Sequence, residues 1–286
     1  MKNGWQKTWE VLFPYLLYYL AYNAAYLILA FVYQASVKKI GGAYGQFMVT
    51  QAPTVTGVMG GLCMLAGILP LVPMLKEELR ARGETFGFMR TKAADDTGVI
   101  SAARRRYMQG RMAALTVILA FSLSLGLNAL LTLSGFVDSS QAYQEVADRQ
   151  YGVAFAVGLV LYGLISPVAE EVVFRGVIYN RLRRLYNPVV GIFVSGMLFG
   201  AFHGNLVQGV YGACLGMMMA YLYERSGNFL IPLLFHAVAN LAVYAMARFA
   251  GVQEILFTPA GCAVLLAVSA MGIVIVYRGG GGQDER

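Results

Sequence analysis

Three apolar segments of the chain carry ionisable side chains that could perform acid–base or metal chemistry. Glu170, Glu171 and Arg175 lie in one segment, and the only two histidines, His203 and His236, lie in two others. An ionisable side chain is costly in the hydrocarbon core of a bilayer, so intramembrane examples usually mark a functional site. Together the three segments predict an enzyme active site.

Helical spacing separates the possible roles of the acidic pair. Glu171 and Arg175 are four residues apart and therefore share a helix face, where they can form an ion pair. Glu170 is rotated by about 100° from its neighbour, so it is less directly matched to the arginine. One carboxylate can thus act as a structural counter-ion while the other remains free for chemistry.

The remaining polar groups suit the hydrolysis of an amide. His236 and Asn240 share a helix face, and Phe199 lies one turn before His203. Amide hydrolysis needs a base to deprotonate water and donors that stabilise the oxyanion. Alternatively, Glu170, His203 and His236 could ligate zinc and leave a position open for water. Water is the nucleophile in both alternatives.

Other intramembrane protease designs lack their residues. All five aspartates lie outside the apolar segments, and the zinc-binding pattern HExxH does not occur. Ser195 has no helper residue at a suitable spacing, and Ser166, beside Pro167, is expected to bond the backbone that the proline opens. The three cysteines, Cys63, Cys214 and Cys262, are interpreted as apolar packing residues.

Composition places this chemistry in a membrane. The chain is 58% hydrophobic and 13% charged, with a mean hydropathy of +0.60. Apolar runs of about 20 residues, the length that crosses a bilayer, recur along it. We expect an all-α, polytopic transmembrane helix bundle with eight spans, at roughly 11–33, 55–75, 112–135, 152–174, 188–204, 206–223, 229–248 and 257–277.

Depth in the bilayer provides a test of the predicted site. The charged ends of the helices mark where each begins on the inner side. Counting from those ends at 1.5 Å per residue places Glu170, His203, His236 and Asn240 at heights of about 16–22 Å. Side chains that are far apart in the sequence therefore converge on one layer near the middle of the membrane.

The net charge of +7 describes topology and does not indicate nucleic-acid binding. With both termini inside, seventeen basic residues fall on the inner side and four on the outer side, and Arg175 lies within the membrane. The positive-inside rule therefore orients the chain N-in and C-in. We expect contacts with membrane lipids, including some attraction to anionic headgroups, and no nucleic-acid partner.

The chain divides into three regions. Residues 1–135 hold three spans and a basic inner loop, 76–111, which is interpreted as a solvated connector in preference to a surface helix. A mildly acidic outer loop, 137–150, follows. Residues 151–248 hold every ionisable side chain found within a span and form the expected catalytic core, and residues 249–286 hold the last span and a flexible tail.

The ordered motifs resemble one known family. Glu170-Glu171-x-x-x-Arg175, then Phe199-x-x-x-His203, then His236-x-x-x-Asn240, each in an apolar segment, are similar to the motifs of the CPBP family. That family comprises CAAX proteases and bacteriocin-processing enzymes, also called Abi proteins or type II CAAX prenyl endopeptidases. The resemblance covers about residues 150–248.

The resemblance implies an intramembrane endopeptidase, either glutamate-dependent or a metalloprotease. Glu170 matches the family's water-activating glutamate, Arg175 the arginine that supports the acidic pair, and His203 the histidine that works with the glutamate. His236 and Asn240 match the pair assigned to the oxyanion or, with zinc, a ligand and its neighbour. The implied substrate is a peptide or a lipidated protein, and the expected location is a bacterial cytoplasmic membrane.

Two other classes of function remain open. A proton-coupled transporter also places Glu, His and Arg at mid-membrane, but it would more often show repeated, broken helices in both halves of the chain. A non-catalytic bacteriocin-immunity protein would bind a peptide without cleaving it. Replacement of Glu170 by glutamine separates these alternatives, because only the endopeptidase would lose cleavage.

Overall fold

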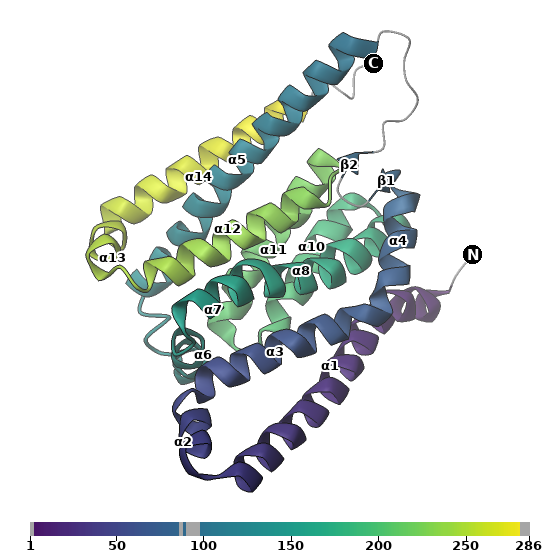
Figure 1. Cartoon of the computed structure of the whole chain (residues 1–286). Helices are drawn as coiled ribbons and strands as arrows, with labels where there is room; N and C mark the ends of the chain where they lie inside the picture. The colour runs from purple at the N-terminus through teal and green to yellow at the C-terminus, as the bar shows by residue number, and fades with distance from the viewer. Residues whose placement is uncertain (1–2, 86–87, 90–97, 281–286) are drawn as a thin grey trace.

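The computed structural model describes residues 3–85, 88–89 and 98–280, in which the elements are helical except for one short hairpin (Figure 1). The N-terminal elements are α1 (Gly4–Ile40), α2 (Gly42–Thr50), α3 (Ala52–Ile68), the 3-10 turn η1 (Leu69–Leu71), α4 (Val72–Ala81), β1 (Glu84–Thr85), β2 (Phe88–Met89) and α5 (Gly98–Leu133). The C-terminal elements are α6 (Gln141–Tyr151), α7 (Phe155–Val160), the π-helix η2 (Leu161–Ile165), α8 (Ser166–Glu171), the π-helix η3 (Val172–Tyr179), α9 (Asn180–Leu185), α10 (Pro188–Phe202), α11 (Leu206–Ser226), α12 (Leu230–Met246), α13 (Ala250–Leu256) and α14 (Pro259–Gly280).

The protein is a polytopic membrane protein. Among the described residues, six helices are long and apolar enough to cross a bilayer: Gly4–Ile40, Ala52–Ala81, Gln109–Leu133, Phe155–Leu185, Leu206–Ser226 and Pro259–Arg278. Two shorter apolar helices, Pro188–Phe202 and Leu230–Met246, complete the set. These eight segments correspond one to one with the eight expected spans, so the predicted all-α bundle is confirmed.

The span Phe155–Leu185 lies at the centre of the bundle. Over half of its most apolar window (56%) is buried inside the protein, against 6% for the window of α1. Its large side chains Phe174 and Tyr179 lie in the main core together with Tyr223 of α11 and Phe235 of α12. The helices α1 and α14 lie near opposite edges of the bundle, where α1 packs on α3 and α14 on α5 (Figure 1).

The connections gather at two opposite ends of the bundle (Figure 1). The short helices α2, α6 and α13 lie at one end, which we call the α6 end. The start of α1, the β1–β2 hairpin and the end of α14 lie at the other, which we call the basic end. The two ends of the described chain therefore lie on the same side, as an even number of spans requires. Which end faces the cytoplasm remains a prediction from the positive-inside rule.

Ion pairs join the segments that meet at the basic end. They are Arg181–Glu78 (3.2 Å), Arg184–Glu78 (2.6 Å), Arg82–Glu224 (3.2 Å) and Arg183–Glu224 (2.8 Å). Glu78 and Arg181 are both buried, so this part of the network is protected from solvent. The pairs link α4, α9 and α11 and close the bundle at this end.

The interpretation of residues 76–111 as a solvated connector is wrong for the parts at its two ends. Residues 76–81 belong to α4 and residues 98–111 to α5, while residues 86–87 and 90–97 lie outside the described part of the chain. α4 continues because Leu75, Glu78 and Leu79 lie on one helix face and are buried there. The helices on both sides therefore extend beyond the expected apolar runs: α4 ends at Ala81, and α5 begins at Gly98.

The interpretation of residues 137–150 as a loop is also wrong. They contain most of α6, which begins after Ser140. The Ser140 side chain accepts a hydrogen bond from the Tyr143 backbone N–H and so satisfies one free donor at the start of the helix. This helix contributes one wall of the cavity described below.

Candidate active site

The predicted ion pair between Glu171 and Arg175 forms in the buried centre of the bundle. Arg175 Nη1 donates to Glu171 Oε1 at 2.7 Å, and both side chains have no exposed surface. Arg175 Nη2 donates to the Gly216 carbonyl of α11 at 2.9 Å, and the guanidinium carbon lies 4.6 Å from the centre of the Phe199 ring. A charge buried this deeply has to be paired, as Arg175 is with Glu171. The other contacts of Arg175 join η3 to α10 and α11.

His236 of α12 bridges the two glutamates. Its Nδ1 lies 2.8 Å from Glu171 Oε1, and its Nε2 lies 3.7 Å from Glu170 Oε2. The carboxylate of Glu171, already paired with Arg175, accepts the hydrogen bond, so Nδ1 of His236 carries the proton. Nε2 of His236 then keeps its lone pair and lies on the side of Glu170. Spacing within single helices did not predict the contact between Glu171 and His236.

Glu170 accepts a hydrogen bond from the hydroxyl of Ser166. The sequence-based expectation that Ser166 bonds the opened backbone is therefore wrong. Ser166 lies four residues before Glu170, the same spacing that predicted the pair of Glu171 with Arg175, so this spacing could have identified the contact. Both side chains line the cavity, and Glu170 is buried.

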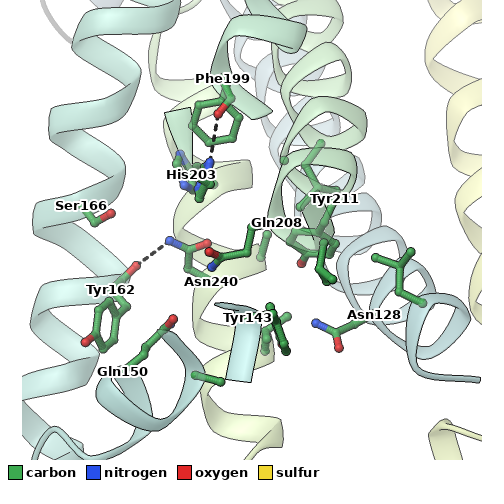
Figure 2. A pocket seen from close by; sticks show the side chains of 18 of the residues that line it. Asn128, Tyr143, Gln150, Tyr162, Ser166, Phe199, His203, Gln208, Tyr211 and Asn240 are labelled. Carbon is green, nitrogen blue, oxygen red and sulfur yellow. Dashed lines mark hydrogen bonds between the residues drawn. The ribbon is translucent and has the colours of Figure 1, made fainter. Parts of the chain in front are cut away.

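His203 lies directly after the last residue of α10, where the chain turns into α11. Its Nδ1 lies 2.9 Å from the Phe199 carbonyl oxygen, which can only accept, so Nδ1 carries the proton and Nε2 is left with a lone pair (Figure 2). Gly204 follows at φ 73°, a left-handed conformation that glycine adopts without strain. The predicted contact of Phe199 with His203 is present at 5.0 Å between ring centres, with the rings nearly perpendicular.

Asn240 is held by an irregularity in the central span. In the π-helix η2, the backbone N–H of Ser166 donates to the Leu161 carbonyl, five residues earlier. The next residue, Pro167, has no N–H to donate to Tyr162 O in the same register. The Asn240 side-chain amide donates to that carbonyl at 3.1 Å (Figure 2). Proline therefore creates the acceptor that positions Asn240.

A cavity of about 200 Å³ contacts the predicted site residues. Glu170, His203, His236 and Asn240 line it, whereas Glu171 and Arg175 lie behind its wall. The structure therefore brings four of the six predicted residues to one cavity and uses the other two to support them. Side chains from distant segments therefore meet at one cavity, as predicted, while their depth in the membrane stays a prediction.

The donor types at Glu170, His203 and His236 suit zinc, but their placement does not. The partners of Nδ1 in both imidazoles leave each Nε2 available for a metal, with Glu171 orienting His236 from behind. Across residues 3–85, 88–89 and 98–280, however, no three His, Cys, Asp or Glu side chains are gathered so that they could hold a metal ion together. In this arrangement the expected ligand set is incomplete.

Residues 152–242 match the family described as type II CAAX prenyl endopeptidase Rce1-like. This segment is an Rce1-like domain. All six predicted site residues lie inside it, and the family resemblance predicted from the motifs is confirmed. The spans α1, α3, α5 and α14 lie outside the Rce1-like domain.

One curated relative is similar to part of the chain. A protein of Bacillus subtilis (strain 168) named "Putative membrane peptidase YdiL" is 26% identical over 112 residues, which is 39% of this chain and 45% of the relative. The chain thus matches a little under half the length of that relative. No solved structure matches significantly.

The close packing of α10 on α11 yields a prediction about Gly216. A Cβ atom at Gly216 would lie 3.0 Å from the Gly196 Cα and 3.1 Å from both Arg175 Nη2 and Phe199 Cδ1. We expect Gly216→Ala to displace Arg175 and to lower the free energy of unfolding by about 1–3 kcal/mol, because the core is already filled. Thermal unfolding of the purified protein in detergent measures the effect.

Gly209 provides a matched control on the same helix. A Cβ atom there would meet its nearest neighbour outside the helix, the Gly200 carbonyl oxygen, only at an ordinary contact of 3.8 Å. Gly209→Ala is therefore expected to leave stability unchanged or slightly higher, since alanine favours helix. Equal unfolding temperatures for the two variants would contradict the tight packing of Arg175 against Gly216.

Proposed function

We propose that the protein is a membrane endopeptidase that hydrolyses a peptide bond at Glu170 with water as the nucleophile. The observation that carries the proposal is the placement of the Glu170 carboxylate, which is buried, lines a cavity and lies beside an imidazole. The Rce1-like domain supports the reaction class, because the matched family is one of endopeptidases.

Glu170 acts as the general base in this proposal. A water molecule in the cavity transfers a proton to the carboxylate while its oxygen attacks the substrate carbonyl carbon. When the C–N bond breaks, the protonated Glu170 returns that proton to the leaving amine nitrogen. The Ser166 hydroxyl holds the carboxylate from one side, which supports a fixed orientation for both transfers.

The two imidazoles orient the attacking water. Nε2 of His203 and Nε2 of His236 each keep a lone pair, because the Phe199 carbonyl and Glu171 bind their Nδ1 protons. Both rings line the cavity with Glu170. A water that donates one hydrogen to Glu170 and the other to one of these imidazole nitrogens is oriented for attack, and Glu170 Oε2 lies 3.7 Å from His236 Nε2.

Asn240 supplies a neutral donor for the oxyanion. Its amide nitrogen has two N–H groups, and the hydrogen bond to Tyr162 O at 3.1 Å occupies one of them. The other is available in the cavity to the negative oxygen that develops as water attacks. Because the Tyr162 carbonyl fixes the amide beforehand, little reorganisation is needed during the reaction.

The geometry favours the endopeptidase over the transporter and the immunity protein. A transport path has to reach both membrane faces, whereas Arg175, Tyr179 and Tyr223 are fully buried between the site and the basic end. A binding protein has no need of a buried carboxylate between a serine hydroxyl and an imidazole. We further propose a peptide or protein substrate and a location in a bacterial cytoplasmic membrane, which the Bacillus subtilis relative supports.

Replacement of the base tests the proposal. We expect Glu170→Gln to lower the rate of peptide cleavage by about 10²–10⁴-fold, because the amide cannot accept the proton. The assay is cleavage of a quenched fluorescent peptide library by purified protein in lipid vesicles. Glu254→Gln, which removes an exposed carboxylate on α13, serves as the control. Undiminished cleavage by Glu170→Gln would remove Glu170 from the mechanism, and altered solute uptake without any cleavage would favour a transporter.

Chelation tests the metal alternative. Because three ligands are not gathered among the described residues, we expect cleavage to persist after treatment with a zinc chelator, with no stoichiometric zinc in elemental analysis. Loss of cleavage on chelation and its recovery with added zinc would instead support a site in which Glu170, His203 and His236 close around the ion.

A further inference from the structure

We propose that the substrate reaches Glu170 from the α6 end, as an extended and uncharged peptide segment presented at the outer face of the membrane. The proposal rests on the proposed function for the reaction itself. The direction of access and the chemistry of the entry path rest on separate observations, which concern the cavity wall, the closed basic end and the distribution of charge.

The cavity extends from the site residues to α6. Tyr143, Ala147 and Gln150 of α6 line it together with Glu170 of α8 and with His203, which follows α10. Figure 2 shows Tyr143 and Gln150 at one end of the cavity, with Phe199 and His203 at the other. Tyr143 and Gln150 are each partly exposed, so α6 forms the mouth of the cavity.

The opposite direction is closed by packed side chains. Arg175 fills the space behind Glu171, where it bonds to the Gly216 carbonyl and lies over the Phe199 ring. Beyond it, toward the basic end, Tyr179 and Tyr223 are fully buried with their rings 5.6 Å apart. The ion pairs of Glu78 and Glu224 follow. A peptide arriving at the basic end would have to displace this core.

The charges distinguish the two membrane faces. At the α6 end the described charged side chains balance, with four basic and four acidic: Lys38, Lys39, Arg149, Arg248, Asp138, Glu145, Asp148 and Glu254. Most of the other described lysines and arginines lie toward the basic end. The positive-inside rule places the basic end in the cytoplasm, so the mouth at α6 opens to the outer face.

The wall of the entry path indicates the chemistry of its occupant. Between the site and the mouth, the polar lining side chains are amides and phenols: Asn128, Tyr143, Gln150, Tyr151, Tyr162, Gln208, Tyr211 and Asn240. The rest of this stretch is aliphatic, and within the described residues no lysine or arginine lines the cavity. Amides can pair with a peptide backbone, whereas a charged substrate side chain would be desolvated here without a counter-ion.

These observations together select a substrate class. An exported peptide, or an outer segment of a membrane protein, presents an extended backbone at the outer face and can enter beside α6. A polypeptide that remains in the cytoplasm meets the closed basic end. The wall of amides and phenols also suits a peptide backbone better than a long lipid chain, which would leave those groups unpaired.

Cysteine accessibility tests the direction of access without requiring catalysis. The native cysteines are first replaced by alanine at Cys63, Cys214 and Cys262. Single cysteines are then introduced by Ala147→Cys at the mouth, Lys38→Cys at the α6 end and Lys76→Cys at the basic end. A membrane-impermeant thiol reagent is applied to intact spheroplasts and, separately, to inside-out vesicles.

We expect the Ala147→Cys and Lys38→Cys proteins to react in spheroplasts, and the Lys76→Cys protein to react only in inside-out vesicles. Modification of the Ala147→Cys protein from outside should then abolish its cleavage of the quenched peptide, while modification at position 38 leaves cleavage unchanged. Reaction of the Ala147→Cys protein from the same side as Lys76→Cys, or full cleavage after its modification, overturns the proposal. Either result leaves the effect of Glu170→Gln intact, so failure of the access route is distinguishable from failure of the endopeptidase.

Peptide charge tests the chemistry of the path. Quenched peptides that contain only uncharged residues are compared with the same peptides carrying two lysines or two aspartates, added outside right-side-out vesicles. We expect cleavage of the uncharged peptides and its loss for both charged sets, through a higher KM. Equal kcat/KM for the charged and uncharged sets overturns the assignment of an uncharged substrate.

Discussion

The pairing of a fully buried arginine inside an apolar bundle is the constraint on which the rest of the site depends. An unpaired guanidinium at this depth is strongly unfavourable, so Arg175 needs Glu171, the Gly216 carbonyl and the Phe199 ring together. These partners come from three helices, and each must be at the correct rotation. The same Glu171 oxygen also accepts from His236, so the ion pair fixes an imidazole next to Glu170.

Two irregularities in the helices bring Asn240 and His203 to the candidate site. Pro167 leaves the Tyr162 carbonyl without its backbone donor in the π-helical register, and Asn240 takes that place. At the end of α10, Gly204 lets the chain turn directly after His203, whose ring packs against Gly212 of α11. In a regular helix the Tyr162 carbonyl would bond to its own backbone and could not hold Asn240. The turn after His203 likewise lets its ring reach the cavity.

The two ends of the bundle differ in structure: the basic end is closed by ion pairs, and the cavity opens at the α6 end. Ion pairs around Glu78 and Glu224 tie α4, α9 and α11 together at the basic end, which leaves the helices there little freedom. At the other end, α6 covers the cavity through tyrosine, alanine and glutamine side chains and without ion pairs to the site. The site is thus supported from one side of the membrane and approached from the other.

Residue types and helical spacing alone determined the eight apolar helical segments, the pair of Glu171 with Arg175 and the contact of Phe199 with His203. Apolar length and the i,i+4 rule are local properties of a helix, so they can be recognised without knowledge of its neighbours. Only the tertiary structure decided that His236 bonds Glu171, that α6 is a helix at the mouth of the cavity, and that the cavity opens there. Those features depend on the rotation and crossing of helices that are distant in the sequence, which no spacing within one segment encodes.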